Sequence, residues 1–196
     1  MASKRQKKTQ VRGRDARTDV IDAALRLAAL RAWDRVTLAD IAEEAGISLA
    51  ALAQMFTCRE DIVTAYARRV DADALSGISG EGSERDRLFD AVMQRLERLN
   101  RDRAAVVSIL HGAMTDPRLA VVTLPHIARS MLWMLEACGI ETQGMKGAAR
   151  IAGLSAVYLW TLRTWRGDES ADLGKTMATL DGALARAESL AGMVGL

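Results

Sequence analysis

The stretch TLADIAEEAGISLAALAQMF, residues 37–56, decides the fold of the first part of the chain. Thr37 is a residue type that caps helix N-termini well. The apolar residues behind it recur at spacings of three and four, which predicts a short amphipathic helix. Gly46 then supplies the backbone conformation of a tight turn, and Ser48 is placed to cap a second short helix. The stretch therefore predicts a helix-turn-helix motif.

Amphipathic helices are expected on both sides of this motif. A helix that begins near Arg14 has apolar residues at spacings of three and four, and it ends beside Trp33. A longer amphipathic helix follows the motif and runs through Val70. The inward-facing residues of the first helix are expected to be Val20, Ile21, Ala24, Leu25 and Ala28. Those of the second motif helix are expected to be Leu49, Leu52 and Phe56.

The rest of the chain is also predicted to be helical, because it holds few β-branched runs and the whole sequence has only 2 prolines. Further helices are predicted at residues 85–99, 101–114, 118–138, 145–166 and 171–192. The third of these is expected to be interrupted or bent at Pro125, and the last to be capped by Ser170. The predicted fold class is all-α, with a three-helix helix-turn-helix domain followed by a larger helical domain.

Composition suggests the domain boundaries. The Gly- and Ser-rich residues 76–84 form the predicted linker between a domain at 14–75 and a domain at 85–196. Residues 1–13 are polar and basic, which predicts a disordered arm. Residues 1–17 carry a net charge of +6, residues 18–78 carry −4, and the remainder is neutral. A basic run is often only a solvated end, but beside a helix-turn-helix a DNA-binding role is favoured.

The order of motifs along residues 17–70 is specific. An Ala/Leu-rich first helix is followed by an aromatic residue before VT, by ADIAEEAGIS, by an aromatic residue that ends the third helix, and by CREDIV. In this order the chain resembles the DNA-binding domain of the TetR family of transcriptional regulators. The resemblance implies a homodimer paired through the last two helices and a ligand cavity in the C-terminal domain. It also implies a repressor that releases a palindromic operator on double-stranded DNA when a small apolar effector binds.

The resemblance also indicates which residues would meet DNA. Family members commonly have Lys after the serine that corresponds to Ser48, then Tyr and His near the end of the helix. This chain has Leu49, Ala53 and Gln54 instead. Phosphate contacts supply affinity and base-edge contacts supply specificity; glutamine pairs with adenine, and alanine can touch a thymine methyl. The expected contacts, which include the basic arm and the helix N-termini, are Arg12, Arg14, Arg35, Thr37, Ser48, Leu49, Ala50, Ala53, Gln54 and Arg59.

The C-terminal half concentrates Met and Trp on helices that are apolar around much of their circumference. Most apolar helix faces of this kind are buried in the protein core or in a dimer interface. The more specific hypothesis is a cavity that binds an apolar ligand and anchors it through a few polar side chains. Its expected lining residues are His111, Met131, Trp133, Met134, Tyr158 and Trp160.

Two other functions, those of a lipid-binding protein and of an enzyme, have different support in the sequence. The segment from residue 154 to residue 188 resembles the end of the TetR-fold lipid-binding proteins of ubiquinone biosynthesis, which bind lipid and do not need DNA. An enzyme is disfavoured because no nucleophile motif, phosphate loop or metal-ligand spacing is present. No cofactor or metal is therefore expected. Cys58 and Cys138 are isolated, and the chain shows neither a secretory signal nor a membrane span, so a cytoplasmic protein is predicted.

Overall fold

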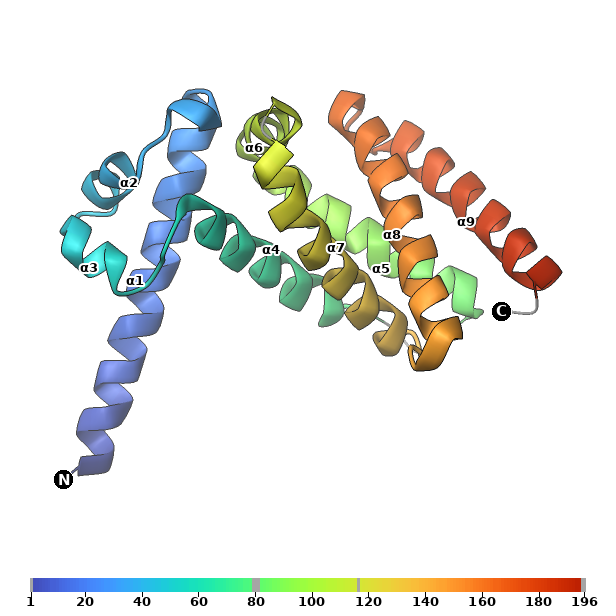
Figure 1. Ribbon diagram of the computed structural model, residues 1–196, viewed down its shortest axis with the longest axis horizontal. Coiled ribbons are helices and arrows are strands. Elements are labelled where there is room, and N and C mark those ends of the chain that lie inside the picture. The colour runs from blue at the N-terminus through green and yellow to red at the C-terminus, as the bar shows by residue number, and fades with distance from the viewer. Residues whose placement is uncertain (1, 79–81, 116, 195–196) are drawn as a thin grey trace. The chain divides into compact units, whose positions relative to one another are not determined.

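The computed structural model describes residues 2–78, 82–115 and 117–194, with side chains described within residues 16–78, 82–113 and 123–193. The described residues form α-helices and one 3₁₀ turn, with no β-strand among them, which confirms the predicted all-α class. The elements, labelled in Figure 1 where there is room, are α1 (Ala2–Leu30), η1 (Trp33–Arg35), α2 (Leu38–Glu44), α3 (Leu49–Ala53), α4 (Arg59–Leu75), α5 (Glu84–Arg101), α6 (Arg103–Thr115), α7 (Pro117–Ala137), α8 (Gly144–Gly167) and α9 (Gly174–Val194).

The helices gather into two compact units. Unit 1 comprises Met1–Ala67 and Asp102–Val122, and unit 2 comprises Arg68–Arg101 and Thr123–Leu196. This division differs from the predicted boundary at the Gly/Ser-rich stretch, because it falls inside α4 and α7 rather than in a loop.

The division inside α4 has a physical cause, since the two halves of this helix bond to different partners. Tyr66 donates a hydrogen bond from its hydroxyl to Asp102 at 2.9 Å, within unit 1. One turn later, Asp71 accepts a hydrogen bond from Arg95 at 2.7 Å, within unit 2. A Gly/Ser-rich sequence marks a loop, but it does not show which helices pack together.

The core of unit 1 contains the predicted face of α1. Val20, Ile21, Ala24, Leu25 and Ala28 are all buried, as predicted. Helix α6 packs against this part of the chain, which the sequence did not indicate: the Ser108 hydroxyl accepts a hydrogen bond from the Trp33 amide at 3.1 Å and donates one to the Arg31 carbonyl at 3.2 Å. Unit 1 is therefore a helix-turn-helix domain completed by a helix from far along the chain.

Helix α1 begins at Ala2, twelve residues before the predicted start near Arg14. The predicted disordered arm, residues 1–13, therefore has helical backbone from its second residue. Its Lys, Arg, Gln and Ala residues have high intrinsic helix propensity, and no proline interrupts them, so a helix nucleated on the buried face of α1 can propagate backward.

Unit 2 is built around α5, α8 and α9, with α7 completing it. Helix α7 is continuous through Pro125 rather than interrupted there. Ser170 does not cap α9, which begins at Gly174. The Asp168 carboxylate does so instead, because it accepts hydrogen bonds from the Thr176 amide at 2.9 Å and from the Thr176 hydroxyl at 2.8 Å. The Ser170 hydroxyl donates to the same carboxylate at 2.5 Å.

Candidate nucleic-acid interface

The turn between α2 and α3 is fixed by backbone hydrogen bonds at the end of α2. The Ile47 amide donates to the Ala42 carbonyl, and the Gly46 amide donates to the Glu43 carbonyl, each at 3.0 Å. Gly46 has a φ of 66°, a left-handed conformation that glycine adopts without a β-carbon clash. This pattern is a Schellman motif, which ends α2 and turns the chain sharply into α3.

Serine 48 begins α3 by accepting a hydrogen bond from the Ala51 amide at 3.1 Å. Leu52 and Phe56 are buried against the rest of unit 1, as predicted. Leu49 is 51% exposed, so the prediction that it packs inward is wrong. Helical side chains lean toward the helix N-terminus, and Leu49 is the first residue of α3, so its side chain reaches beyond the packed part of the helix.

The exposed side of α3 brings several predicted DNA contacts together. The residues on this side carry no charge, and all of them lie on one short helix or at its two caps. These exposed residues are Ser48, Leu49, Ala50, Ala51, Ala53 and Gln54.

Arg17, which the sequence analysis did not single out, ties the end of α3 to α1. Its Nη1 donates a hydrogen bond to the Met55 carbonyl at 2.9 Å, and its guanidinium lies 4.4 Å from the centre of the Phe56 ring. These contacts hold the residues that follow α3 at a defined distance from α1. The partners are 38 residues apart, so no local spacing in the sequence signals the contact.

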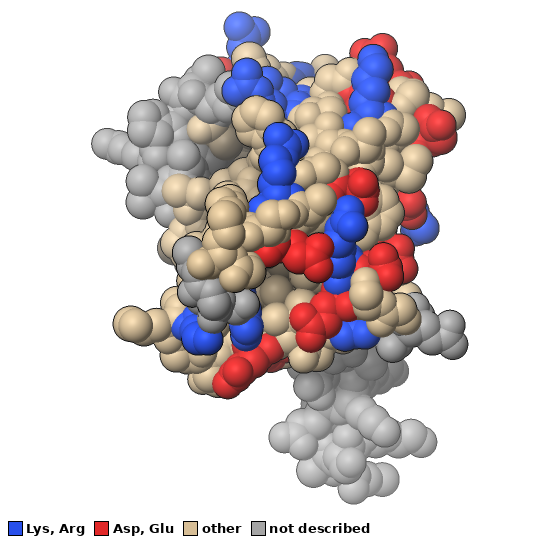
Figure 2. Space-filling view, turned by 90° about the vertical axis from the view of Figure 1, so that its right-hand side faces the viewer, with Lys and Arg blue, Asp and Glu red and all other residues tan. Residues whose placement is uncertain are grey.

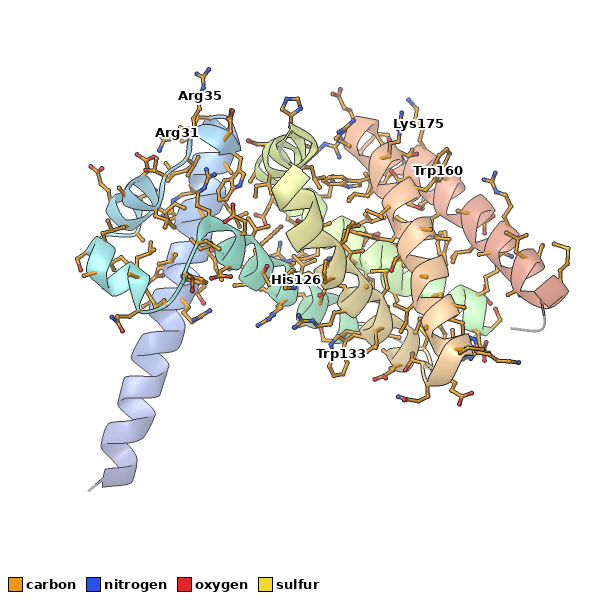
Figure 3. All side chains as sticks on the ribbon, in the orientation of Figure 1. Arg31, Arg35, His126, Trp133, Trp160 and Lys175 are labelled. Carbon is orange, nitrogen blue, oxygen red and sulfur yellow. The ribbon has the colours of Figure 1, made fainter. Side chains whose placement is uncertain are left out.

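Arg59 has a structural partner in the same unit. Its Nη1 donates to the carbonyls of Trp33 at 2.9 Å and of Val36 at 2.5 Å, and its guanidinium lies 5.5 Å from the Trp33 ring. A cation is stabilised at such carbonyl groups where a helical turn ends. Arg35 is exposed, and Figure 3 shows it projecting near Arg31, from the end of unit 1 where α1 finishes.

The acidic residues of α2 are partly compensated by α1 and its C-terminal end. Arg26 pairs with Glu44 at 2.7 Å, and Arg31 pairs with Asp40 at 3.0 Å. Hydrogen bonds from the Thr37 amide and hydroxyl, at 2.8 and 2.7 Å, lower the pKa of the Asp40 carboxyl. The predicted phosphate site at Thr37 thus already faces a carboxylate. Two of the acidic side chains of α2 are thus paired with cations of the same unit.

The side chains of Arg12 and Arg14, the predicted contacts on the arm, lie outside the described residues.

The six predicted pocket residues differ in burial and in the unit that holds them. Met131, Met134 and Tyr158 are buried in unit 2, whereas His111 is exposed and belongs to unit 1. Trp133 and Trp160 are 51% and 59% exposed. Figure 3 shows these two tryptophans at different edges of unit 2. The helical repeat explains the exposure of Trp133: on α7 the buried positions 130, 131, 134 and 135 share one face, and residue 133 falls on the other.

A buried polar network in unit 2 was not predicted from the sequence. The Arg95 Nε donates to Asp71 at 2.7 Å, and the Ser130 hydroxyl donates to the other oxygen of Asp71 at 2.6 Å. Arg95 Nη1 donates to the Tyr158 hydroxyl, and its guanidinium lies 4.7 Å from the Tyr158 ring. Burial raises the pKa of the Tyr158 phenol, which keeps the ring neutral. The network joins α4, α5, α7 and α8, each contributing one residue.

Within the described residues, no three His, Cys, Asp or Glu side chains gather as a metal site would require. No helix in the same part of the chain has the length and apolarity needed to cross a membrane.

Comparison with known proteins agrees with this architecture. Residues 20–66 match the family model described as bacterial regulatory proteins, tetR family. No curated protein matches the sequence significantly. Among solved structures, a TetR transcriptional regulator from Nitrosomonas europaea has a TM-score of 0.72 and 23% identity, with 88% of this chain and 97% of that chain covered.

Two further structures share the fold. A TetR transcriptional regulator from a Rhodococcus species has a TM-score of 0.65 and 17% identity, covering 89% of this chain and 97% of that chain. The TetR family repressor AlkX from a Dietzia species, implicated in biodegradation of n-alkanes, has a TM-score of 0.56 and 18% identity. The match covers 88% of this chain and 95% of that chain. Residues 20–66 therefore form a domain of the tetR family of bacterial regulatory proteins, and the chain as a whole shares the fold of TetR regulators of solved structure.

Proposed function

We propose that this TetR-family protein is a transcriptional repressor that binds a palindromic operator as a homodimer and is released by a small apolar effector. The observation that carries the proposal is the exposed side of α3, the second helix of a helix-turn-helix within the matched domain. In that motif the second helix enters the major groove, and a dimer reads two half-sites about one helical turn apart. The charge on α1 supplies affinity for phosphates.

The proposed dimer uses α8 and α9. Large apolar side chains are exposed on these helices: Trp160 is 59% exposed, Leu190 is 60% exposed and Met193 is 74% exposed. Figure 2 shows the side of the molecule that lies at the right of Figure 1, and there charged side chains of both signs are interspersed with large uncharged areas. A contiguous exposed apolar patch commonly marks a protein interface, and the proposed dimer would cover these side chains.

The apolar effector is proposed to bind in unit 2, where Met131, Met134 and Tyr158 line the interior. Similarity of fold to AlkX, a repressor implicated in n-alkane biodegradation, supports an apolar effector. Such a compound can release the operator only if it binds the DNA-free state more tightly than the DNA-bound state. The site of action is then the cytoplasm, where bacterial DNA lies.

The test is selection of bound duplexes from a random DNA pool by the full-length protein near physiological salt. Enrichment of a palindrome is expected, and release of that duplex is then measured with a series of n-alkanes and fatty acids. Failure to enrich any sequence would refute the operator proposal.

One observation favours a second function. The exposed residues of α3 carry no charge, which suits a TetR-fold protein that binds lipid or isoprenoid and does not read DNA. This alternative predicts a copurifying apolar molecule, detectable by mass spectrometry of an organic extract, together with no sequence preference at any salt concentration.

A further inference from the structure

The outward surface of α3 is made of hydrocarbon, apart from the Ser48 hydroxyl at its N-terminal cap and the amide of Gln54. Leu49 is 51% exposed, and the methyl groups of Ala50 and Ala53 are exposed beside it. Gln54 supplies the only long polar side chain on the helix and its C-terminal cap. No charged residue occurs from Ala45 to Cys58, so nothing on this helix can form the bidentate arginine contact that recognises guanine.

The base edges of the major groove differ sharply in what they offer to such a surface. Guanine presents two acceptors and cytosine presents an amino donor, and burying any of these against hydrocarbon leaves it without a hydrogen-bond partner. Thymine presents a C5-methyl group, the one apolar group on any base edge in that groove. Adenine N7 and N6 and thymine O4 also lose partners against hydrocarbon, but only an A·T pair offers a methyl group whose contact offsets that cost. An apolar face therefore favours thymine over guanine or cytosine.

We propose that α3 reads its half-site through thymine methyl groups. Leu49, Ala50 and Ala53 contact the methyls, and Gln54 pairs with adenine through its amide, so the bases under α3 form a short run of A·T pairs. This inference rests on the proposed operator-binding function and names the chemistry of the site that α3 recognises.

The supports of α3 suit this form of recognition, because contact with a methyl group depends on close approach. The Schellman turn at Gly46 and the Ser48 cap fix the start of the helix. The Arg17 contacts with Met55 and Phe56 fix its end. The exposed surface thus lies on a helix held at both ends.

The experiment removes methyl groups from the DNA and leaves the protein unchanged. The operator is first obtained by selection from a random pool, and each thymine in a half-site is then replaced singly by deoxyuridine, which keeps the hydrogen-bonding edge and lacks the methyl. Binding by the full-length protein is measured by fluorescence anisotropy. At the positions under α3 we expect affinity to fall about fourfold for each contacted methyl group.

A protein variant then assigns the contact. In Leu49→Ala the penalty for deoxyuridine should shrink at the position that Leu49 covers and stay unchanged elsewhere. Leu124→Ala is the matched control, since Leu124 is 52% exposed and lies on α7. It should leave every deoxyuridine penalty as in the wild type.

The possible results separate the inference from the proposed function. If a palindrome is enriched but no deoxyuridine substitution weakens binding, or if Leu49→Ala leaves all penalties unchanged, methyl recognition by α3 is overturned while operator binding stands. If no sequence is enriched, the proposed function itself fails, and the inference fails with it.

Discussion

Replacing Asp71 with asparagine tests whether the buried network holds unit 2 together. The change keeps the size of the side chain and removes the negative charge opposite Arg95. The side chains of this pair are only 5% and 13% exposed, for Arg95 and Asp71 respectively, and their atoms lie 2.7 Å apart. The variant therefore leaves a buried guanidinium without its counter-charge.

The expected loss follows from that geometry. Removing one partner of a buried ion pair destabilises a protein by roughly 3–5 kcal/mol, because the remaining charge stays buried and unpaired. For a chain of this length each kcal/mol lowers the melting temperature by about 2–4 °C. We expect a decrease on the order of 10 °C in the unfolding transition of unit 2.

The same two helices offer a matched control. Arg98 of α5 pairs with Asp73 of α4 at 2.8 Å, but the Asp73 side chain is 51% exposed. Because solvent screens such a pair, Asp73→Asn is expected to change stability by only about 0–1 kcal/mol.

Urea unfolding followed by circular dichroism, with calorimetry alongside, measures both variants under the same conditions. If Asp71→Asn and Asp73→Asn lower the free energy of unfolding by equal amounts, burial of the Asp71–Arg95 pair does not make the loss of its carboxylate more destabilising. The double variant Asp71→Leu/Arg95→Met adds a further check, since replacing both charges should restore part of what the single change removes.

Three further outcomes are expected. Arg17→Gln should weaken operator binding by loosening α3 while leaving the slope of log affinity against log salt unchanged; a slope smaller by about 1 would instead show a lost phosphate contact. Because hydrogen bonds from Ser170 and Thr176 hold the pKa of Asp168 below its usual value, this group stabilises the fold at pH values above its unfolded pKa. That contribution is lost as the pH falls through the folded pKa, so Asp168→Asn should flatten the decrease in stability seen on acid titration below about pH 4. Trp160→Arg should shift sedimentation from dimer toward monomer without changing the helical content, and an unchanged dimer would place the interface elsewhere.

Local patterns in the sequence predicted the parts of the fold that depend on local physics. The apolar face of α1, from Val20 to Ala28, follows from helical periodicity alone. The turn at Gly46 follows from the conformational freedom of glycine, and the Thr37 and Ser48 caps follow from side-chain chemistry. Each of these features involves residues within a few positions of one another, so the sequence shows them directly.

Contacts between distant helices could not be predicted in the same way. Arg17 meets Met55 across 38 positions, and Arg95 meets Tyr158 across 63. Periodicity indicates which face of a helix is buried, but it does not show which other helix covers that face. The position of Trp133 shows a further limit, because Met and Trp content alone does not separate the buried side of α7 from its exposed side.

In the proposed mode of DNA binding, affinity and specificity come from different parts of unit 1. The six basic residues among positions 1–14 carry the charge that attracts phosphates, whereas α3 carries none. Phosphate attraction acts on any DNA sequence and weakens as salt rises, while contact with a methyl group is apolar and depends little on salt. Salt should therefore lower binding to the operator and to random DNA by similar factors, so that the ratio between them is preserved. A helix with Lys at position 49, as is common in the family, would add a positive charge beside the bases. That lysine would contribute both to the salt-dependent affinity and to the preference for the operator, so the two contributions would be harder to separate.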